Sequence, residues 1–296
     1  MFNKKDCIFM FPGIGDDYRK YIHNWNKEDY QELCEYAKIA KRDYGVDIIG
    51  ENTGSYVNSW VLNYTCDYFV YRKHTKAGLE PKYMMGYSLG AITALACAGA
   101  FDYEDGVYIL KEIASYRKPI LEEQLMIVIG FTVNELQAII AEYHLTEKVF
   151  IACINNDCCV TVAGRKKDIV EFELQIEKVG ALKTKLIETP YAFHTEYMKE
   201  CIDNFAEKIS GINYKECSVS VISSIDQKKI VSTQNVYEEL VRNLYSALNW
   251  RDTILKFENG NGYKFVESGL TKSMIKVTRL IAEDQEFIDL SYLLKK

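Results

Sequence analysis

Hydrophobic and polar positions near the N-terminus predict a sheet of buried parallel strands. Residues 7–11 form a short continuous apolar run that ends at Pro12 and Gly13, a pattern typical of a strand buried on both faces. Apolar residues at helical spacing, with glycines where they stop, predict helices at residues 29–44, 56–74 and 89–98, and a second strand is predicted at residues 83–86. This alternation of strand and helix indicates an α/β fold with helices on both faces of a parallel sheet.

The middle of the chain consists of shorter segments in a different order. We predict strands at residues 125–131, 149–155, 159–163 and 182–188, and helices at residues 133–145 and 169–179. The order β-α-β-β-α-β is that of a ferredoxin-like unit. We therefore expect a small subdomain at residues 124–189, inserted between the two parts of a large domain at residues 1–123 and 190–296. The second part is predicted to contain helices at residues 196–209 and 236–247 and a strand at residues 219–223.

Composition and charge narrow the class of protein. The chain has 296 residues, of which 48% are hydrophobic, enough to bury a sizeable core. A net charge of -6 with scattered basic residues argues against a nucleic-acid partner. Nine cysteines without the paired spacing of a zinc site predict free thiols in a reducing cytosol. Because no stretch approaches the roughly 20 apolar residues of a membrane helix, we expect a cytoplasmic protein with no membrane partner.

The motif Gly-Tyr-Ser-Leu-Gly at residues 86–90 carries the first candidate for chemistry. It follows a predicted strand and opens a predicted helix, the context in which a Gly-x-Ser-x-Gly pattern positions a serine nucleophile. The amide of Leu89, at the helix N-terminus, would point at an oxyanion formed on Ser88. The alternative is a small residue in a glycine-rich turn with no chemical role.

A serine nucleophile needs a base, and the chain has four histidines. Three of them, His23, His74 and His144, lie in polar or amphipathic stretches where a solvated imidazole is the simpler interpretation. His194 lies in the aromatic stretch "TPYAFHTEYM", where the chain re-enters the large domain. His194 is therefore the candidate base, although a single histidine in such a stretch can equally be structural.

Five blocks of sequence together resemble the malonyl-CoA:acyl-carrier-protein transacylase family. They are "FMFPGIG" at 9–15, "GYSLGAITALACAGAFDYEDGV" at 86–107, "INNDCCVTVAG" at 154–164, "YAFH" at 191–194 and "VRNLYSALNW" at 241–250. The blocks follow the family order and spacing across nearly the whole chain. The resemblance implies an α/β-hydrolase-like large domain with an inserted ferredoxin-like small subdomain and an active site between them.

The resemblance also implies roles for individual residues. Ser88 would be the nucleophile and His194 the general base, and the backbone carbonyl of Asn243 would orient the imidazole. The amides of Ile14 and Leu89 would bind the oxyanion. The implied reaction is a ping-pong transfer through an acyl-serine, with CoA or acyl-carrier-protein thioesters as substrates, an acyl carrier protein as partner, and no bound cofactor or metal. We expect the protein to be a monomer.

The sequence departs from the family where the acyl group is held. Ile113 occupies the position of the family's arginine, whose guanidinium pairs with the malonyl carboxylate, and an aliphatic side chain offers that carboxylate no hydrogen bond. Arg117, one helical turn further on, is a candidate replacement or a solvated residue beside Lys118. The other expected pocket residues are aromatic: Tyr87, Tyr191 and Phe193. We therefore expect an uncharged acyl group.

Three other functions fit parts of this sequence. The first is a hydrolase on the same scaffold that releases acyl groups from carrier proteins, with water in place of the second thiol. The second is a carrier-protein binder without activity, against which the retention of both Ser88 and His194 argues. The third is an unrelated esterase, whose base usually lies closer to the C-terminus than His194 does.

Overall fold

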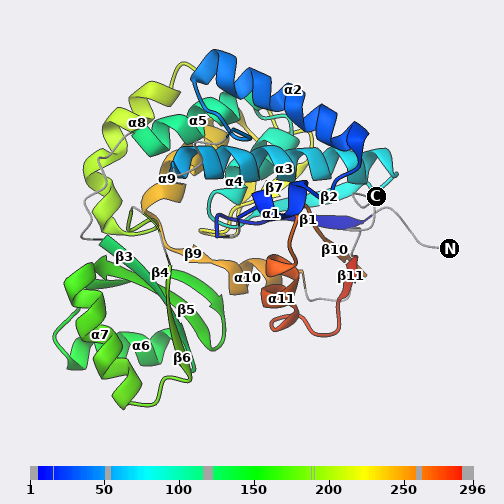
Figure 1. Ribbon diagram of the computed structural model, residues 1–296. Coiled ribbons are helices and arrows are strands. Elements are labelled where there is room, and N and C mark those ends of the chain that lie inside the picture. Colours follow the sequence, from blue (N-terminus) through cyan, green and yellow to red (C-terminus); the bar gives the residue numbers. More distant parts are fainter. Residues whose placement is uncertain are drawn as a thin grey trace.

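Two β-sheets organise the protein. The computed structural model describes residues 6–15, 17–50, 55–115, 123–187, 189, 191–257 and 262–288. A six-stranded sheet forms the centre of the large domain, and a five-stranded sheet forms the small subdomain beside it (Figure 1). The parallel sheet of the large domain and the antiparallel sheet of the small one confirm the predicted mixed α/β class.

The large sheet has the strand order β11-β10-β1-β2-β7-β8. Its strands are β1 (Cys7–Phe11), β2 (Pro81–Gly86), β7 (Ser220–Ile222), β8 (Lys229–Ile230), β10 (Lys264–Glu267) and β11 (Glu286–Ile288). Neighbouring strands are parallel except β8, which runs antiparallel to β7. Strand β1 has the bounds that its apolar run predicts, and β2 begins two residues earlier than expected.

Both faces of the large sheet are covered by helices, as Figure 1 shows. Alternate residues of β1 belong to separate cores. Phe9 and Phe11 pack with four helices, α2 (Lys27–Tyr44), α3 (Tyr56–Lys76), α4 (Gly90–Cys97) and α5 (Tyr103–Ser115). Ile8 and Met10 pack with two others, α10 (Trp250–Leu255) and α11 (Ser273–Arg279). All four side chains are buried. A strand in this position can have no polar face, which explains its continuous apolar sequence.

Where apolar residues recur at helical spacing over a long stretch, the helices of the large domain lie at the predicted positions. They are α1 (Arg19–Ile22), α2 (Lys27–Tyr44), α3 (Tyr56–Lys76), α4 (Gly90–Cys97), α5 (Tyr103–Ser115), α8 (Ile202–Ile209), α9 (Thr233–Tyr245), α10 (Trp250–Leu255) and α11 (Ser273–Arg279). Helix α2 starts at Asn26, whose side chain accepts a hydrogen bond from the Asp29 amide, and ends at Gly45 with a φ of 71°. The helix expected at residues 196–209 divides into a 3₁₀ helix, Glu196–Cys201, and α8.

The small subdomain has the strand order β6-β3-β5-β4-β9. Its elements are β3 (Glu123–Ile129), α6 (Val133–Glu142), β4 (Val149–Asn156), β5 (Cys159–Arg165), α7 (Lys166–Lys178), β6 (Lys183–Ile187) and β9 (Leu248–Asn249). The first four strands are antiparallel, and α6 and α7 share a core with one face of the sheet. Strand β9 joins β4 in parallel from the far end of the chain. The domain boundaries drawn from the sequence stay a prediction.

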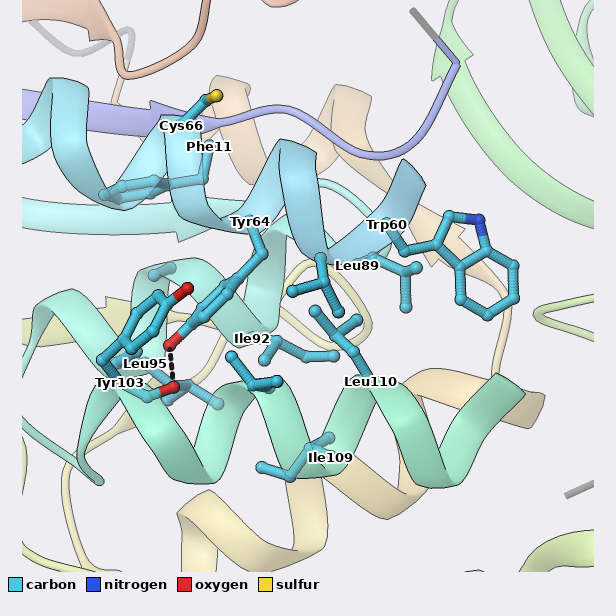
Figure 2. Close-up of a cluster of buried hydrophobic side chains, with 14 of the residues drawn as sticks. Phe11, Trp60, Tyr64, Cys66, Leu89, Ile92, Leu95, Tyr103, Ile109 and Leu110 are labelled. Atoms are coloured by element: carbon cyan, nitrogen blue, oxygen red, sulfur yellow. Dashed lines mark hydrogen bonds between the residues drawn. The ribbon is translucent and has the colours of Figure 1, made fainter. Parts of the chain in front are cut away.

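Helices α3 and α5 approach each other closely in the core of the large domain (Figure 2). The rings of Tyr64 and Tyr103 stack with centroids 5.3 Å apart, and the Tyr64 hydroxyl donates a hydrogen bond to the Tyr103 carbonyl at 3.1 Å. The Tyr103 hydroxyl bonds the Thr65 hydroxyl at 2.7 Å. Gly106 faces Tyr64 so closely that a methyl group at Gly106 would overlap the phenol.

We expect Gly106→Ala to destabilise the protein. Alanine favours the helical backbone by about 1 kcal/mol, but overpacking a filled core costs about 1–3 kcal/mol, and the buried, hydrogen-bonded Tyr64 cannot turn aside. The net loss, measured by urea denaturation, is expected to be about 1 kcal/mol. Gly211→Ala is the matched control, because nothing lies within 4 Å of its Cβ position and its change should stay within about 0.5 kcal/mol. Equal stability of the two variants would contradict the packing argument.

Candidate active site

Ser88 lies in the tight turn between β2 and α4, with its backbone in the left-handed region at a φ of 55°. The two glycines of the motif make this turn possible. A side chain at Gly86 would overlap the backbone of Gly90 and Ala91, and one at Gly90 would overlap the carbonyls of Phe11 and Pro12. The turn is therefore packed against the segment that follows β1, and only glycine fits at either position.

His194 approaches Ser88 from the segment that follows the small subdomain. Its Nε2 lies 2.8 Å from the Ser88 Oγ. The His194 amide donates to the carbonyl of Leu244 in α9 at 2.7 Å, and its φ is 64°. Both residues of this pair thus adopt a backbone conformation that costs non-glycine residues about 1–3 kcal/mol, and the surrounding packing maintains it.

Burial controls the protonation of His194. The side chain is almost fully buried, and this desolvation lowers its pKa from 6.5 to about 4. The backbones of Asn243 and Ser246 act in the opposite direction and raise the pKa, as nearby hydrogen-bond acceptors do. The Nδ1 atom itself is buried and forms no hydrogen bond of ordinary geometry with either backbone or with any other described residue. The imidazole is therefore neutral at pH 7, the form that can accept the Ser88 proton at Nε2.

Asn243 also acts on Ser88 through its side chain. The Nδ2 of Asn243 donates a hydrogen bond to the Ser88 carbonyl at 3.0 Å, and the Ser224 hydroxyl donates to the Gly86 carbonyl at 2.8 Å. The turn is thus held from α9 and from the loop after β7 as well as by its own backbone. From the sequence, only the backbone carbonyl of Asn243 is expected to act, by orienting the imidazole, and Ser224 has no predicted role.

The two residues whose amides are expected to bind an oxyanion belong to the serine turn and to the segment packed beside it. Leu89 is the residue directly before the first turn of α4. Gly13, next to Ile14, lies so close to the turn that a Cβ there would be 3.2 Å from the Ser88 Cβ. Within the described part of the chain, the amides of Ile14 and Leu89 donate no hydrogen bond. Two free donors beside a serine are what a developing oxyanion requires.

Tyr87 connects the turn to the small subdomain. Its hydroxyl donates to the Asn155 Oδ1 in β4 at 2.6 Å, and its ring meets the Trp250 ring edge-on with centroids 5.8 Å apart. Asn155 in turn donates to the Thr161 hydroxyl of β5 at 3.1 Å. Tyr87 therefore lies at the junction of the two domains. Asn155 belongs to the block "INNDCCVTVAG", which the sequence reasoning used for the resemblance without giving any residue in it a role.

The remaining predicted pocket residues gather in one buried cluster. Ile113, Tyr191 and Phe193 are each no more than 3% exposed and share the core of α3, α4 and α5. The Tyr191 hydroxyl donates to the Ala114 carbonyl at 2.9 Å. Arg117 lies outside the described residues. Trp60 of α3 belongs to the same cluster, with its ring 5.8 Å from that of Phe193, and no motif in the sequence indicated it.

A cavity of about 520 Å³ opens beside His194. The large domain contributes His194, Thr195, Glu196, Tyr245 and Ala247, and the small subdomain contributes residues of α6 and β4. The cavity thus lies between the two domains and is lined by His194 but not by Ser88, the other residue of the candidate dyad. Among the described residues, no group of three or more His, Cys, Asp or Glu side chains could hold a metal ion, and no helix is both long and apolar enough to cross a membrane. None of the nine cysteines, all of which lie in the described residues, forms a disulfide.

Comparisons with known proteins identify relatives of this chain. Residues 71–268 match the model of the acyl transferase domain family. The malonyl CoA-acyl carrier protein transacylase of Bacillus subtilis is 25% identical in an alignment 313 residues long. The alignment covers 96% of this chain and 95% of that protein.

Two solved structures share the fold. The malonyl CoA-acyl carrier protein transacylase of Coxiella burnetii superimposes with a TM-score of 0.89 at 22% identity, covering 98% of this chain and 96% of that one. A malonyl-transacylase in complex with a type II polyketide synthase acyl-carrier protein gives a TM-score of 0.87 at 20% identity, with 98% and 97% covered. Because the family model spans most of the chain and the fold agrees throughout, the protein belongs to the acyl transferase domain family.

Proposed function

We propose that the protein transfers an uncharged acyl group between CoA or acyl-carrier-protein thioesters through an acyl-serine on Ser88. The observation that supports this most directly is the 2.8 Å contact between the Ser88 Oγ and the Nε2 of a buried, neutral His194. A polyketide or fatty-acid assembly line is the expected setting, because the relatives are named for malonyl transfer to acyl carrier proteins. An acyl carrier protein is accordingly the proposed partner.

The dyad carries both halves of the reaction. In the first half, His194 Nε2 takes the Ser88 proton while Oγ attacks the thioester carbonyl, and the amides of Ile14 and Leu89 receive the oxyanion. The intermediate collapses, the carbon–sulfur bond breaks, and the imidazolium returns the proton to the departing thiolate. In the second half, an incoming thiol gives its proton to His194 and attacks the ester, and Ser88 leaves with that proton. No bound cofactor or metal takes part in these steps.

The cavity beside His194 is the proposed entrance for the thiol arm of each substrate. It is lined by residues of both the large domain and the small subdomain, and His194 is one of them. An extended arm can therefore present its sulfur to the dyad while the carrier protein remains outside. Because His194 lines this cavity, a thiol that enters through it is brought to the residue that acts as the base.

The residues expected to surround the acyl group favour one without charge. Ile113 is 2% exposed within an apolar and aromatic cluster that includes Leu89 and Phe193. A carboxylate buried there without a partner would cost several kcal/mol relative to water. The proposed acyl group therefore differs from the malonyl group for which the relatives are named, whereas the proposed roles of Ser88 and His194 stay the same.

Ser88→Ala should abolish acyl transfer, by about a thousand-fold or more, because it removes the hydroxyl that His194 Nε2 contacts at 2.8 Å. The purified protein is offered acetyl-, butyryl- and malonyl-loaded carrier proteins, and both the acyl-serine mass and the free acid are followed. Transfer to a second carrier supports the transferase, whereas free acid without transfer indicates the hydrolase. Ser210→Ala, at an exposed serine, is the control. Activity retained by Ser88→Ala would refute both the transferase and the hydrolase function.

Ile113→Arg should increase malonyl acceptance about ten-fold or more relative to acetyl, because a guanidinium can pair with the free carboxylate. The ratio of malonyl to acetyl kcat/KM is the measurement, so that a general loss of activity cancels. Ile113→Leu, of similar volume, should leave the ratio unchanged. A folded Ile113→Arg protein with an unchanged ratio would show that this position does not face the acyl group.

The rate of Ser88 acylation should be nearly independent of pH between 6 and 8. With the pKa of His194 lowered to about 4 by burial, about 99% of the imidazole is still neutral at pH 6, whereas an ordinary histidine with a pKa of 6.5 would be mostly protonated there. Stopped-flow acylation at a fixed thioester concentration tests this. The rate should fall only as the pH approaches about 4. A half-maximal rate near pH 6.5 would contradict the burial argument.

A further inference from the structure

A second cavity, of about 370 Å³, lies in the large domain on the other side of the aromatic residues that back the dyad. It is bounded by the C-terminal ends of α2 and α5 and by the first turns of α3. Its lining includes Tyr44, Tyr56, Trp60, Lys111, Ser115 and Tyr191. Most of this surface is aromatic or aliphatic, with the polar groups at the edges of helices, a lining that suits an apolar ligand.

Three aromatic side chains separate this cavity from the dyad, and we call Trp60, Tyr191 and Phe193 the aromatic wall. The Trp60 and Phe193 rings meet edge-on with centroids 5.8 Å apart, and Tyr191 and Phe193 do so at 5.3 Å. Trp60 and Tyr191 line the cavity, whereas Phe193 directly precedes His194, whose ring centroid is 6.2 Å from that of Phe193. Between the cavity and His194 the wall is therefore two rings thick, with Trp60 or Tyr191 on the cavity side and Phe193 on the side of His194.

Of the three residues, Trp60 is the one whose removal would open the wall. Tyr191 is fixed by the hydrogen bond from its hydroxyl to the Ala114 carbonyl, and Phe193 is part of the segment that positions His194. Trp60 is 3% exposed, projects from α3 and packs in the cluster that contains Leu89, next to Ser88 (Figure 2). Replacing its indole with a methyl group would remove the largest ring between the cavity and the acyl side of the dyad.

We propose that Trp60 limits the length of the acyl group accepted on Ser88, and that the cavity behind it, which we call the chamber, has the chemistry to hold the distal part of a longer apolar acyl chain. This inference rests on the proposed acyl-serine function. The wild-type protein then accepts short acyl groups, because a longer chain would have to displace a buried indole from its packed position. The chamber lining supplies aromatic contacts that such a chain would use once the indole is gone.

The test compares acetyl and octanoyl pantetheine thioesters with the wild type, Trp60→Ala and Trp60→Leu. The measurement is the octanoyl to acetyl ratio of kcat/KM for Ser88 acylation, read from intact-protein mass. We expect wild type to favour acetyl at least ten-fold and Trp60→Ala to shift the ratio toward octanoyl at least ten-fold. Trp60→Leu should shift the octanoyl to acetyl ratio in the same direction by a smaller factor. This milder variant tests the inference if Trp60→Ala does not fold.

Trp25→Ala is the matched control for the loss of a buried indole. Trp25 is 5% exposed, stacks on Phe69 and does not line the chamber. Its ratio should equal that of the wild type. An unchanged ratio in the folded Trp60 variants, or equal acceptance of both thioesters by wild type, overturns the inference about Trp60. The absence of an acyl-serine with any thioester would instead overturn the proposed function itself.

Discussion

The left-handed backbone at Ser88 is the constraint on which the rest of the site depends. With a φ of 55°, the residue is unfavourable in isolation and persists because its surroundings leave no alternative. Gly86 and Gly90 let the turn close against the backbone after β1, and the Asn243 side chain holds the Ser88 carbonyl. The strain is thus compensated by contacts from both ends of the chain, and the serine oxygen projects from the turn rather than into the helix. A looser turn would let the residue relax and withdraw its hydroxyl from His194.

The same turn joins the two domains. Tyr87 reaches Asn155 in the small subdomain, and β9, which follows α9, extends the small sheet beside β4. The Glu123 carboxylate accepts a hydrogen bond from the Ala192 amide at 2.8 Å, so the start of β3 is tied to the segment that carries His194. Any movement of the small subdomain would therefore act on the neighbours of both Ser88 and His194. This arrangement gives a physical reason for inserting the subdomain between the strand that precedes the serine and the segment that carries the histidine.

Much of this arrangement could be predicted from the sequence, and the exceptions have a common cause. The apolar run at residues 7–11, the glycine-bounded motif around Ser88 and the β-α-β-β-α-β order are local signals, and the structure confirms the elements they predicted. Strands of two or three residues, such as β8 and β9, contain too few positions to show a period. The bonds from Asn243 to Ser88 and from Tyr87 to Asn155 join residues 155 and 68 positions apart. Trp60 belongs to a helix buried on most sides, so nothing local distinguishes it from an ordinary core residue.

Burial has two effects on the chemistry of the site, and both act in the same direction. It holds the pKa of His194 near 4, so the imidazole is ready to accept a proton at neutral pH. The apolar surroundings of Ile113 and Phe193 equally disfavour a carboxylate on the acyl group. A site that admitted water and charge around Ile113 would also solvate the neighbouring imidazole, raise its pKa toward the ordinary value and weaken it as a neutral base near pH 6. The apolar surroundings of Ile113 and the neutral state of His194 therefore follow from one packing arrangement. A change at one of these residues is expected to alter the other.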